Sequence, residues 1–260
     1  MTLGDRFGFF DVTQPYIVTY GELPHWEQDG ATYFITFRTV DSLPLSVSEL
    51  LTRHRDDWLR RHGITPNSDD WVAGLRQLSH DLQRTYHREY ATKLEAALDQ
   101  GYGECLLRDR NLARIVADSL LYFDGLHRAE SSVAESLRDS GSELLSNSAT
   151  SDSPTKHLAT IPPVRYHVSD FVIMPNHVHV MVCFLPGVRL LAQCRSWKHY
   201  TAVKINAALG ATGEFWQSES FDHLVRGPDH FRRFRKYIAE NREKAQLKSE
   251  EGLYYRCPDL

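Results

Sequence analysis

The amino-acid sequence predicts an α+β protein in which a few strands accompany several longer helices. Residues 31–38 and 165–173 are rich in β-branched and aromatic side chains, and residues 177–184 alternate between polar and apolar, so all three segments are expected to be strands. Residues 214–226 are expected to form a loop and a short strand. Five segments are expected to be helices: 46–63, 68–100, 111–123, 188–209 and 228–247.

The helices between the first two strands are predicted from their boundaries and spacing. Ser46 and Glu49 have capping-box spacing, and Gly63 is expected to end that helix. Residues 68–100 carry apolar side chains at three- and four-residue steps, which indicates one long helix with a packing face. Residues 102–108 are expected to be extended. We therefore expect a helical excursion over residues 45–124.

Composition predicts one ordinary domain over residues 1–260. The chain is 42% hydrophobic and 25% charged, which is enough apolar material for one sizeable core or for a core plus an appendage. No run of about 18 apolar residues occurs and the N-terminus lacks a signal-peptide pattern, so we expect a cytoplasmic protein without membrane contact. The four cysteines have no Cys-x-x-Cys spacing, which argues against a disulfide framework or a cysteine-based zinc site.

A Ser-rich segment interrupts this domain. Residues 129–163 contain recurring Ser and no Phe, Trp or Tyr. Such a composition cannot bury much apolar surface. We expect a flexible insertion that leaves the surface without dividing the core.

Charge is distributed unevenly along the chain. Residues 1–160 hold 16 Lys and Arg against 24 Asp and Glu, a net charge of −8, whereas residues 161–260 hold 14 against 10, a net charge of +4. The positive half suits phosphate binding, although such a balance is also common on neutral surfaces.

The strand at residues 177–184 presents a candidate metal site in this positive half. Val178, Val180 and Val182 share one face, and His177 and His179 share the other with two further residues. Two imidazoles at this spacing can bind one metal ion. With 13 His in the chain such a pair also arises by chance, so a structural or surface pair is the alternative.

The last predicted helix carries a candidate nucleophile. Tyr237 and Asn241 are four residues apart and share a face beside the apolar stripe. Cationic side chains occupy the turn before the tyrosine: Arg232, Arg233, Arg235 and Lys236. From spacing alone, this segment is equally consistent with a solvated basic face that has a tyrosine at its edge.

Several segments resemble a known family. The run Met-Pro-Asn-His-Val-His-Val-Met-Val at residues 174–182 resembles the His-hydrophobic-His signature of the IS200-like family of single-tyrosine (Y1) transposases in the HUH superfamily, specifically the REP-associated tyrosine transposases. Residues 33–44, 102–108 and 237–241 resemble the same family. The resemblance covers residues 22–124 and 165–248. The family often continues with Asn-Pro-Val-Lys-Ala-Gly-Leu, whereas residues 241–247 here lack the Pro and Gly.

The resemblance implies a fold, an activity and a set of site residues. The implied fold is a ferredoxin-like antiparallel sheet with packed helices. Tyr237 would be the nucleophile, and His177, His179 and Asn241 would bind a divalent metal, Mg²⁺ or Mn²⁺, although Zn²⁺ also suits these ligands. The implied activity is cleavage and transfer of single-stranded or hairpin DNA through a 5′-phosphotyrosine, by a monomer or homodimer.

Further residues are candidates for contact with DNA. Lys198, Lys204, Arg226 and the cations before Tyr237 are expected to bind backbone phosphate, and Trp216 is expected to stack on an unpaired base. A core position is the alternative for Trp216. Tyr200 is the reserve nucleophile, although the adjacent His199 points about 100° away on a helix.

Two other functions compete with this enzyme. One is a DNA-hairpin-binding protein that does not cleave, consistent with the acidic first half and the altered segment after Asn241. The other is a small zinc hydrolase using the same His pair. That reaction requires a carboxylate base near His177, which the neighbouring sequence does not provide.

Overall fold

The computed structural model describes residues 6–20, 24–68, 70–125, 163–248 and 251–258. The predicted Ser-rich insertion at residues 129–163 lies almost wholly outside these described residues. None of the described helices is long and apolar enough to cross a membrane.

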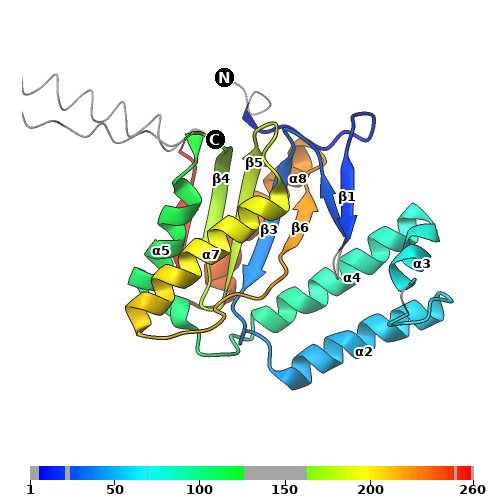
Figure 1. Ribbon diagram of the computed structural model, residues 1–260, viewed down its shortest axis with the longest axis horizontal. Helices are drawn as coiled ribbons and strands as arrows, with labels where there is room; N and C mark the ends of the chain where they lie inside the picture. The colour runs from blue at the N-terminus through cyan, green and yellow to red at the C-terminus, as the bar shows by residue number, and fades with distance from the viewer. Residues whose placement is uncertain (1–5, 21–23, 69, 126–162, 249–250, 259–260) are drawn as a thin grey trace, which may run out of the picture.

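A five-stranded antiparallel sheet forms the centre of the protein (Figure 1). Its strands are β3 (Thr32–Arg38), β4 (Tyr166–Ile173), β5 (His177–Phe184), β6 (Phe221–Leu224) and β7 (Leu253–Arg256). They lie in the order β6-β3-β5-β4-β7. The three predicted strands thus form the centre of the sheet. A separate hairpin, β1 (Ile17–Tyr20) and β2 (Pro24–Glu27), and the edge strand β7 were not predicted.

Helices cover both faces of the sheet (Figure 1). Helices α5 (Arg110–Leu121) and α7 (Leu190–Leu209) pack together on one face, and α8 (Pro228–Lys244) packs against β4 and β5 on the other. The succession β3, α5, β4, β5, α7, β6 with order β6-β3-β5-β4 is the ferredoxin-like βαββαβ arrangement. The predicted fold class, α+β with an antiparallel sheet and packed helices, is confirmed.

The helical excursion differs from its prediction in four respects. The expected helix over residues 68–100 is two helices, α3 (Trp71–Gln77) and α4 (His80–Leu98), because Leu78 is extended and Ser79 caps α4 by accepting a hydrogen bond from the Leu82 N–H at 3.4 Å. Helix α2 (Leu45–Arg61) has no side-chain cap, so the predicted capping box is wrong. Residues 106–108 form a 3₁₀ turn rather than an extended piece. Helix α5 packs on the sheet, so the helical excursion consists of α2, α3 and α4.

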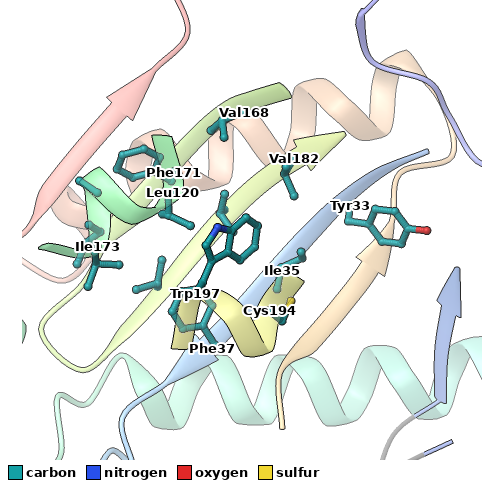
Figure 2. Close-up of a cluster of buried hydrophobic side chains, with 14 of the residues drawn as sticks. Tyr33, Ile35, Phe37, Leu120, Val168, Phe171, Ile173, Val182, Cys194 and Trp197 are labelled. Carbon is teal, nitrogen blue, oxygen red and sulfur yellow. The ribbon is translucent and has the colours of Figure 1, made fainter. Parts of the chain in front are cut away.

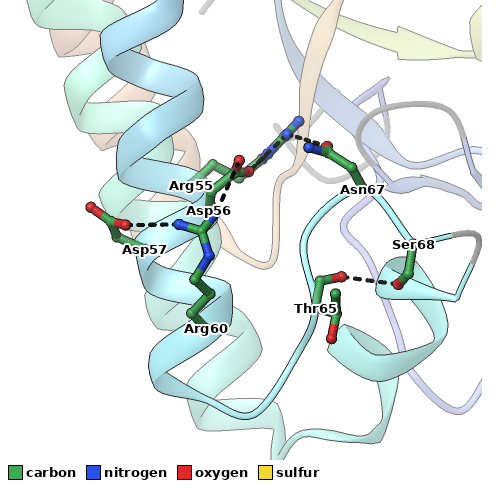
Figure 3. Close-up of polar contacts among 7 residues, drawn as sticks. All are labelled: Arg55, Asp56, Asp57, Arg60, Thr65, Asn67 and Ser68. Atoms are coloured by element: carbon green, nitrogen blue, oxygen red, sulfur yellow. Dashed lines mark hydrogen bonds and ion pairs between the residues drawn. The ribbon is translucent and has the colours of Figure 1, made fainter.

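Polar contacts hold the α2–α3 connection (Figure 3). Arg55 donates to Asp56 at 3.0 Å and to Asn67 at 2.9 Å, which joins the middle of α2 to the loop. Asn67 has a φ of +60°, a conformation that Asn adopts more readily than most residues. The excursion therefore has a defined shape although it lies outside the sheet.

The two faces of β5 pack into separate hydrophobic clusters. Val178, Val180 and Val182 pack with the α5 and α7 side chains, and Figure 2 shows Val182 and Trp197 in this cluster. The Trp197 indole N–H donates to the Tyr166 hydroxyl at 2.9 Å. Met181 on the opposite face packs in the cluster beneath α8. Because side chains alternate along a strand, His177 and His179 are directed toward the α8 face.

A buried ion pair fixes α8 on β4. The Arg235 guanidinium donates to both carboxylate oxygens of Asp170, at 2.7 and 3.3 Å, and the Asp170 side chain is 1% exposed. We expect Asp170→Asn to reduce the free energy of unfolding by about 3–5 kcal/mol, because Arg235 then stays buried without its counter-ion. Urea unfolding measures this change.

The matched control for this prediction is Asp57→Asn. Asp57 pairs with Arg60 at 3.0 Å on the exposed face of α2 (Figure 3), and such surface pairs contribute little to stability. Equal unfolding midpoints for Asp170→Asn and the parent protein would show that the buried pair does not anchor α8.

Candidate functional site

The two histidines of β5 are buried and oriented by hydrogen bonds to their Nδ1 atoms. His177 Nδ1 lies 2.7 Å from the Asn176 side-chain oxygen. The Asn176 amide nitrogen donates to the Tyr102 carbonyl at 2.9 Å, which fixes the amide so that its oxygen accepts from His177. His179 Nδ1 lies 2.7 Å from the Thr36 hydroxyl on β3. In His177 the proton therefore resides on Nδ1, leaving a lone pair on Nε2.

Both Nε2 atoms are buried, and neither has a hydrogen-bond partner among the described residues. The rings of His177 and His179 are 4.7 Å apart between centroids. Burial lowers the pKa of His177 to about 3, and burial together with His177 lowers the pKa of His179 well below its usual value. Neutral imidazoles suit a metal ion, and leaving two buried Nε2 atoms without any partner is unfavourable.

Tyr237 lies beside this pair within the same chain. Its ring meets the His179 ring edge-on, with centroids 5.2 Å apart, and meets Phe34 edge-on at 5.7 Å. The buried Tyr237 hydroxyl forms no hydrogen bond of good geometry within the described residues. Asn241 is buried one turn later on α8, and its amide lies near enough to the hydroxyl to favour the phenolate. The structure thus brings His177, His179 and Tyr237 together, with Asn241 next to the tyrosine.

Two charged residues beside Tyr237 were not predicted. Glu95, on α4, faces the tyrosine, and burial followed by the charge of Asp99 raises the pKa of Glu95 to about 7. Burial, and next the Glu95 charge, raise the pKa of Tyr237 well above its usual value. Lys244 Nζ lies 5.3 Å from the centre of the Tyr237 ring. Nothing in the sequence around Glu95 marks it, because its role depends on where α4 packs.

Tyr237 and Glu95 line one cleft of about 870 Å³. The cleft lies between helix α4 on one side and the edge strand β6 together with helix α8 on the other. Of the basic residues predicted to bind DNA, Arg226 and Arg233 also line it. Tyr237 is thus bordered by the cleft on the side of α4, although its hydroxyl oxygen is buried.

The other cations before Tyr237 have different surroundings. Arg235 is held by Asp170, as described above. Arg232 is exposed and pairs with Asp229, and Lys236 is exposed and lies 3.5 Å from Glu240. None of the three lines the cleft.

The remaining predicted DNA contacts, Lys198, Lys204 and Trp216, lie on the α7 side of the sheet, away from the His pair. Lys198 donates to the carbonyls of Gln217 and Ser218, at 3.1 and 2.6 Å. Trp216 is 6% exposed and donates to the Thr201 hydroxyl at 2.8 Å. Trp216 therefore occupies the core, which was the alternative interpretation, and the expectation that it stacks on a base is corrected.

Lys204 and the reserve nucleophile Tyr200 both lie on α7. Lys204 Nζ is 5.8 Å from the centre of the Tyr200 ring. Tyr200 is 50% exposed and on the opposite face of the sheet from His177 and His179. The structure therefore separates Tyr200 from the His pair.

The described residues contain no cluster of three or more His, Cys, Asp or Glu side chains that could hold a metal ion. A metal at this place would thus have the two imidazoles as its protein nitrogen ligands, with a neutral oxygen such as that of Asn241. Mg²⁺ and Mn²⁺ accept oxygen ligands from amides, water and phosphate, and imidazole also suits Mn²⁺ and Zn²⁺.

Comparison with known proteins gives one similar structure. No protein-family model and no curated protein matches the chain. A solved structure of a REP-associated tyrosine transposase bound to a REP hairpin is 13% identical in sequence, with a TM-score of 0.35, over 86% of this chain and 74% of that chain.

Proposed function

We propose that this protein is a metal-dependent endonuclease and strand transferase acting on single-stranded or hairpin DNA. The observation that carries the proposal is the pair of buried, unpartnered Nε2 atoms of His177 and His179 directly beside Tyr237. The resemblance of residues 174–182 and 237–241 to the REP-associated tyrosine transposases supports the same function.

His177, His179 and Asn241 would hold the divalent ion. A bound ion would supply positive charge that polarises a scissile phosphate. Asn176 and Thr36 hold the two rings in place through their Nδ1 atoms. Such outer hydrogen bonds fix the tautomer and orientation of ligating histidines.

Tyr237 would attack the phosphorus of the bound strand. A bond forms between the phenolic oxygen and phosphorus, the bond from phosphorus to the 3′ oxygen breaks, and the leaving oxygen takes a proton from water. The product is a 5′-phosphotyrosine and a free 3′-hydroxyl, so the phosphodiester energy is kept for rejoining. The phenolic proton passes to the Glu95 carboxylate, and Lys244 favours the developing phenolate.

Detection of the covalent product tests the proposal. The protein is incubated with hairpin or single-stranded DNA labelled on its 3′ side, with Mg²⁺ or Mn²⁺, and then denatured. We expect a labelled protein–DNA species that survives denaturation and is absent when EDTA is present. A collection of hairpins that bind but never give this species under either ion would contradict the proposed reaction.

The pH dependence of the reaction tests Glu95. Since Glu95 has a pKa of about 7 and acts as its carboxylate, adduct formation should increase as the pH rises from about 6 to 8 and then level off. Glu95→Gln should lower the rate by about 10²-fold or more and remove this rise. The control Glu89→Gln, on the exposed surface of α4 outside the cleft, should behave as the parent. An unchanged pH profile in Glu95→Gln would exclude Glu95 as the base.

A DNA-binding protein that does not cleave is the second candidate function. One observation favours it: the Tyr237 hydroxyl is buried and faces the acidic Glu95, both of which oppose formation of the phenolate. This function predicts tight binding of hairpin DNA, with no adduct at any pH or with any divalent ion.

A further inference from the structure

The cleft that Tyr237 helps to line carries cations from three of the segments around it. Arg84 and Arg88 come from α4, Arg226 follows β6, and Arg233 lies on α8. Three acidic residues also line the cleft, and each has its own neighbour: Asp81 pairs with Arg84, Asp222 pairs with His25, and Glu95 faces Tyr237. Arg88, Arg226 and Arg233 have no acidic partner among the described residues.

Arg226 is surrounded by further basic groups. Three histidines line the same cleft, one from each wall: His87 on α4, His223 on β6 and His230 on α8. The His223 and His230 rings have centroids 5.1 Å apart, and His230 Nδ1 accepts a hydrogen bond from the Arg226 backbone N–H at 3.3 Å. Burial and then the Arg84 charge lower the pKa of Arg226. The Arg226 guanidinium therefore lies among other cations and imidazoles, an arrangement that suits the binding of an anion.

We propose that Arg226, His87, His223 and His230 form a binding site for a backbone phosphate of single-stranded DNA, with α4 as one wall of the substrate channel. The proposal deepens the proposed function, on which it rests for the identity of the ligand. It adds α4 to the DNA-binding surface, and the sequence had marked α4 only as a packing helix.

The lining of the cleft favours a single strand over a simple phosphate-containing small molecule. Three partly buried aromatic residues line the same cleft as the cations, namely Trp26, Phe221 and Phe234. Cationic grooves with interleaved aromatic side chains bind single strands, because phosphates contact the cations and bases stack on the rings. A strand bound in this cleft would also lie against Tyr237, which is one of the lining residues.

The three histidines couple this binding to protons. Burial and neighbouring positive charge lower the pKa of His87 and of His230 to about 4, and that of His223 to about 3, so all three are neutral in the free protein near pH 7. A bound phosphate stabilises the protonated imidazoles and raises these pKa values. Binding then takes up protons, so affinity should increase as the pH falls from 7 toward 5.

Direct binding measurements test the site without relying on cleavage. In the full-length Tyr237→Phe protein, anisotropy of a labelled single-stranded oligonucleotide gives the dissociation constant at several salt concentrations and pH values. We expect Arg226→Gln and Arg88→Gln each to weaken binding by about tenfold, and to reduce the salt slope by about 0.7, the value for one phosphate contact on a single strand. Replacing His223 and His230 by Gln together should flatten the pH dependence.

The matched control is Arg114→Gln, which removes the same charge from the exposed surface of α5 on the other face of the sheet. It should bind as the Tyr237→Phe parent does. Parent-like affinity in Arg226→Gln would overturn the site, whatever the result for Arg88→Gln, as would an effect confined to duplex DNA or RNA. If the wild-type protein forms no adduct while Arg226-dependent binding persists, the proposed enzyme is refuted and this binding site stands.

Discussion

Tyr237→Phe should abolish the covalent DNA adduct completely, because it removes the only atom proposed to attack phosphorus. The substitution keeps the ring, whose edge contacts to His179 and Phe34 help to pack α8 on the sheet. The hydroxyl makes no well-formed hydrogen bond within the described residues, so its removal should not lower stability. Loss of the adduct in a protein with unchanged unfolding would therefore be a chemical effect.

Tyr200→Phe is the matched control for this experiment. It removes the same atom from a half-exposed tyrosine on α7, on the opposite face of the sheet from the His pair. Gel electrophoresis after denaturation should show the labelled adduct with Tyr200→Phe and none with Tyr237→Phe. The reverse pattern, or an adduct that persists in Tyr237→Phe, would show that another residue is the nucleophile.

Replacing the histidine pair should have the second largest effect. We expect His177→Gln and His179→Gln each to lower metal-dependent adduct formation by at least about 10²-fold, because each removes one of the two nitrogen ligands. Mn²⁺ should raise the melting temperature of the parent protein, as any ligand of the folded state does, and should leave that of the variants unchanged.

The control for the histidine experiment is His199→Gln, an exposed position on α7 that should keep both the adduct and the Mn²⁺ response. The variants should also bind a single-stranded oligonucleotide as the parent does, because the proposed phosphate site lies in the cleft and neither histidine lines that cleft. This binding shows that they are folded. An unchanged Mn²⁺ response in both His177→Gln and His179→Gln would eliminate the proposed metal centre.

The three central strands of the sheet could be predicted from the sequence, because the patterns that mark them are local. Alternation at residues 177–184 sets which side chains share a face, and the strand has the predicted bounds. The long apolar pattern at residues 68–100 predicted helix but missed the break at Leu78–Ser79. The free energies of one continuous helix and of two helices separated by a cap differ little, so tertiary packing decides which of them forms.

The candidate site divides in the same way. The sequence by itself proposed His177, His179, Tyr237 and Asn241 as candidates, from the spacing within each pair and from the resemblance of residues 174–182 and 237–241 to a known family. Only the tertiary structure decided that Tyr237 faces His179, that Trp216 belongs to the core, and that Lys198 caps backbone carbonyls. The position of Glu95 beside Tyr237 and the proposed phosphate site around Arg226 both depend on α4 reaching the edge of the sheet. Contacts between segments far apart in the chain follow from packing, which leaves no local pattern in the sequence.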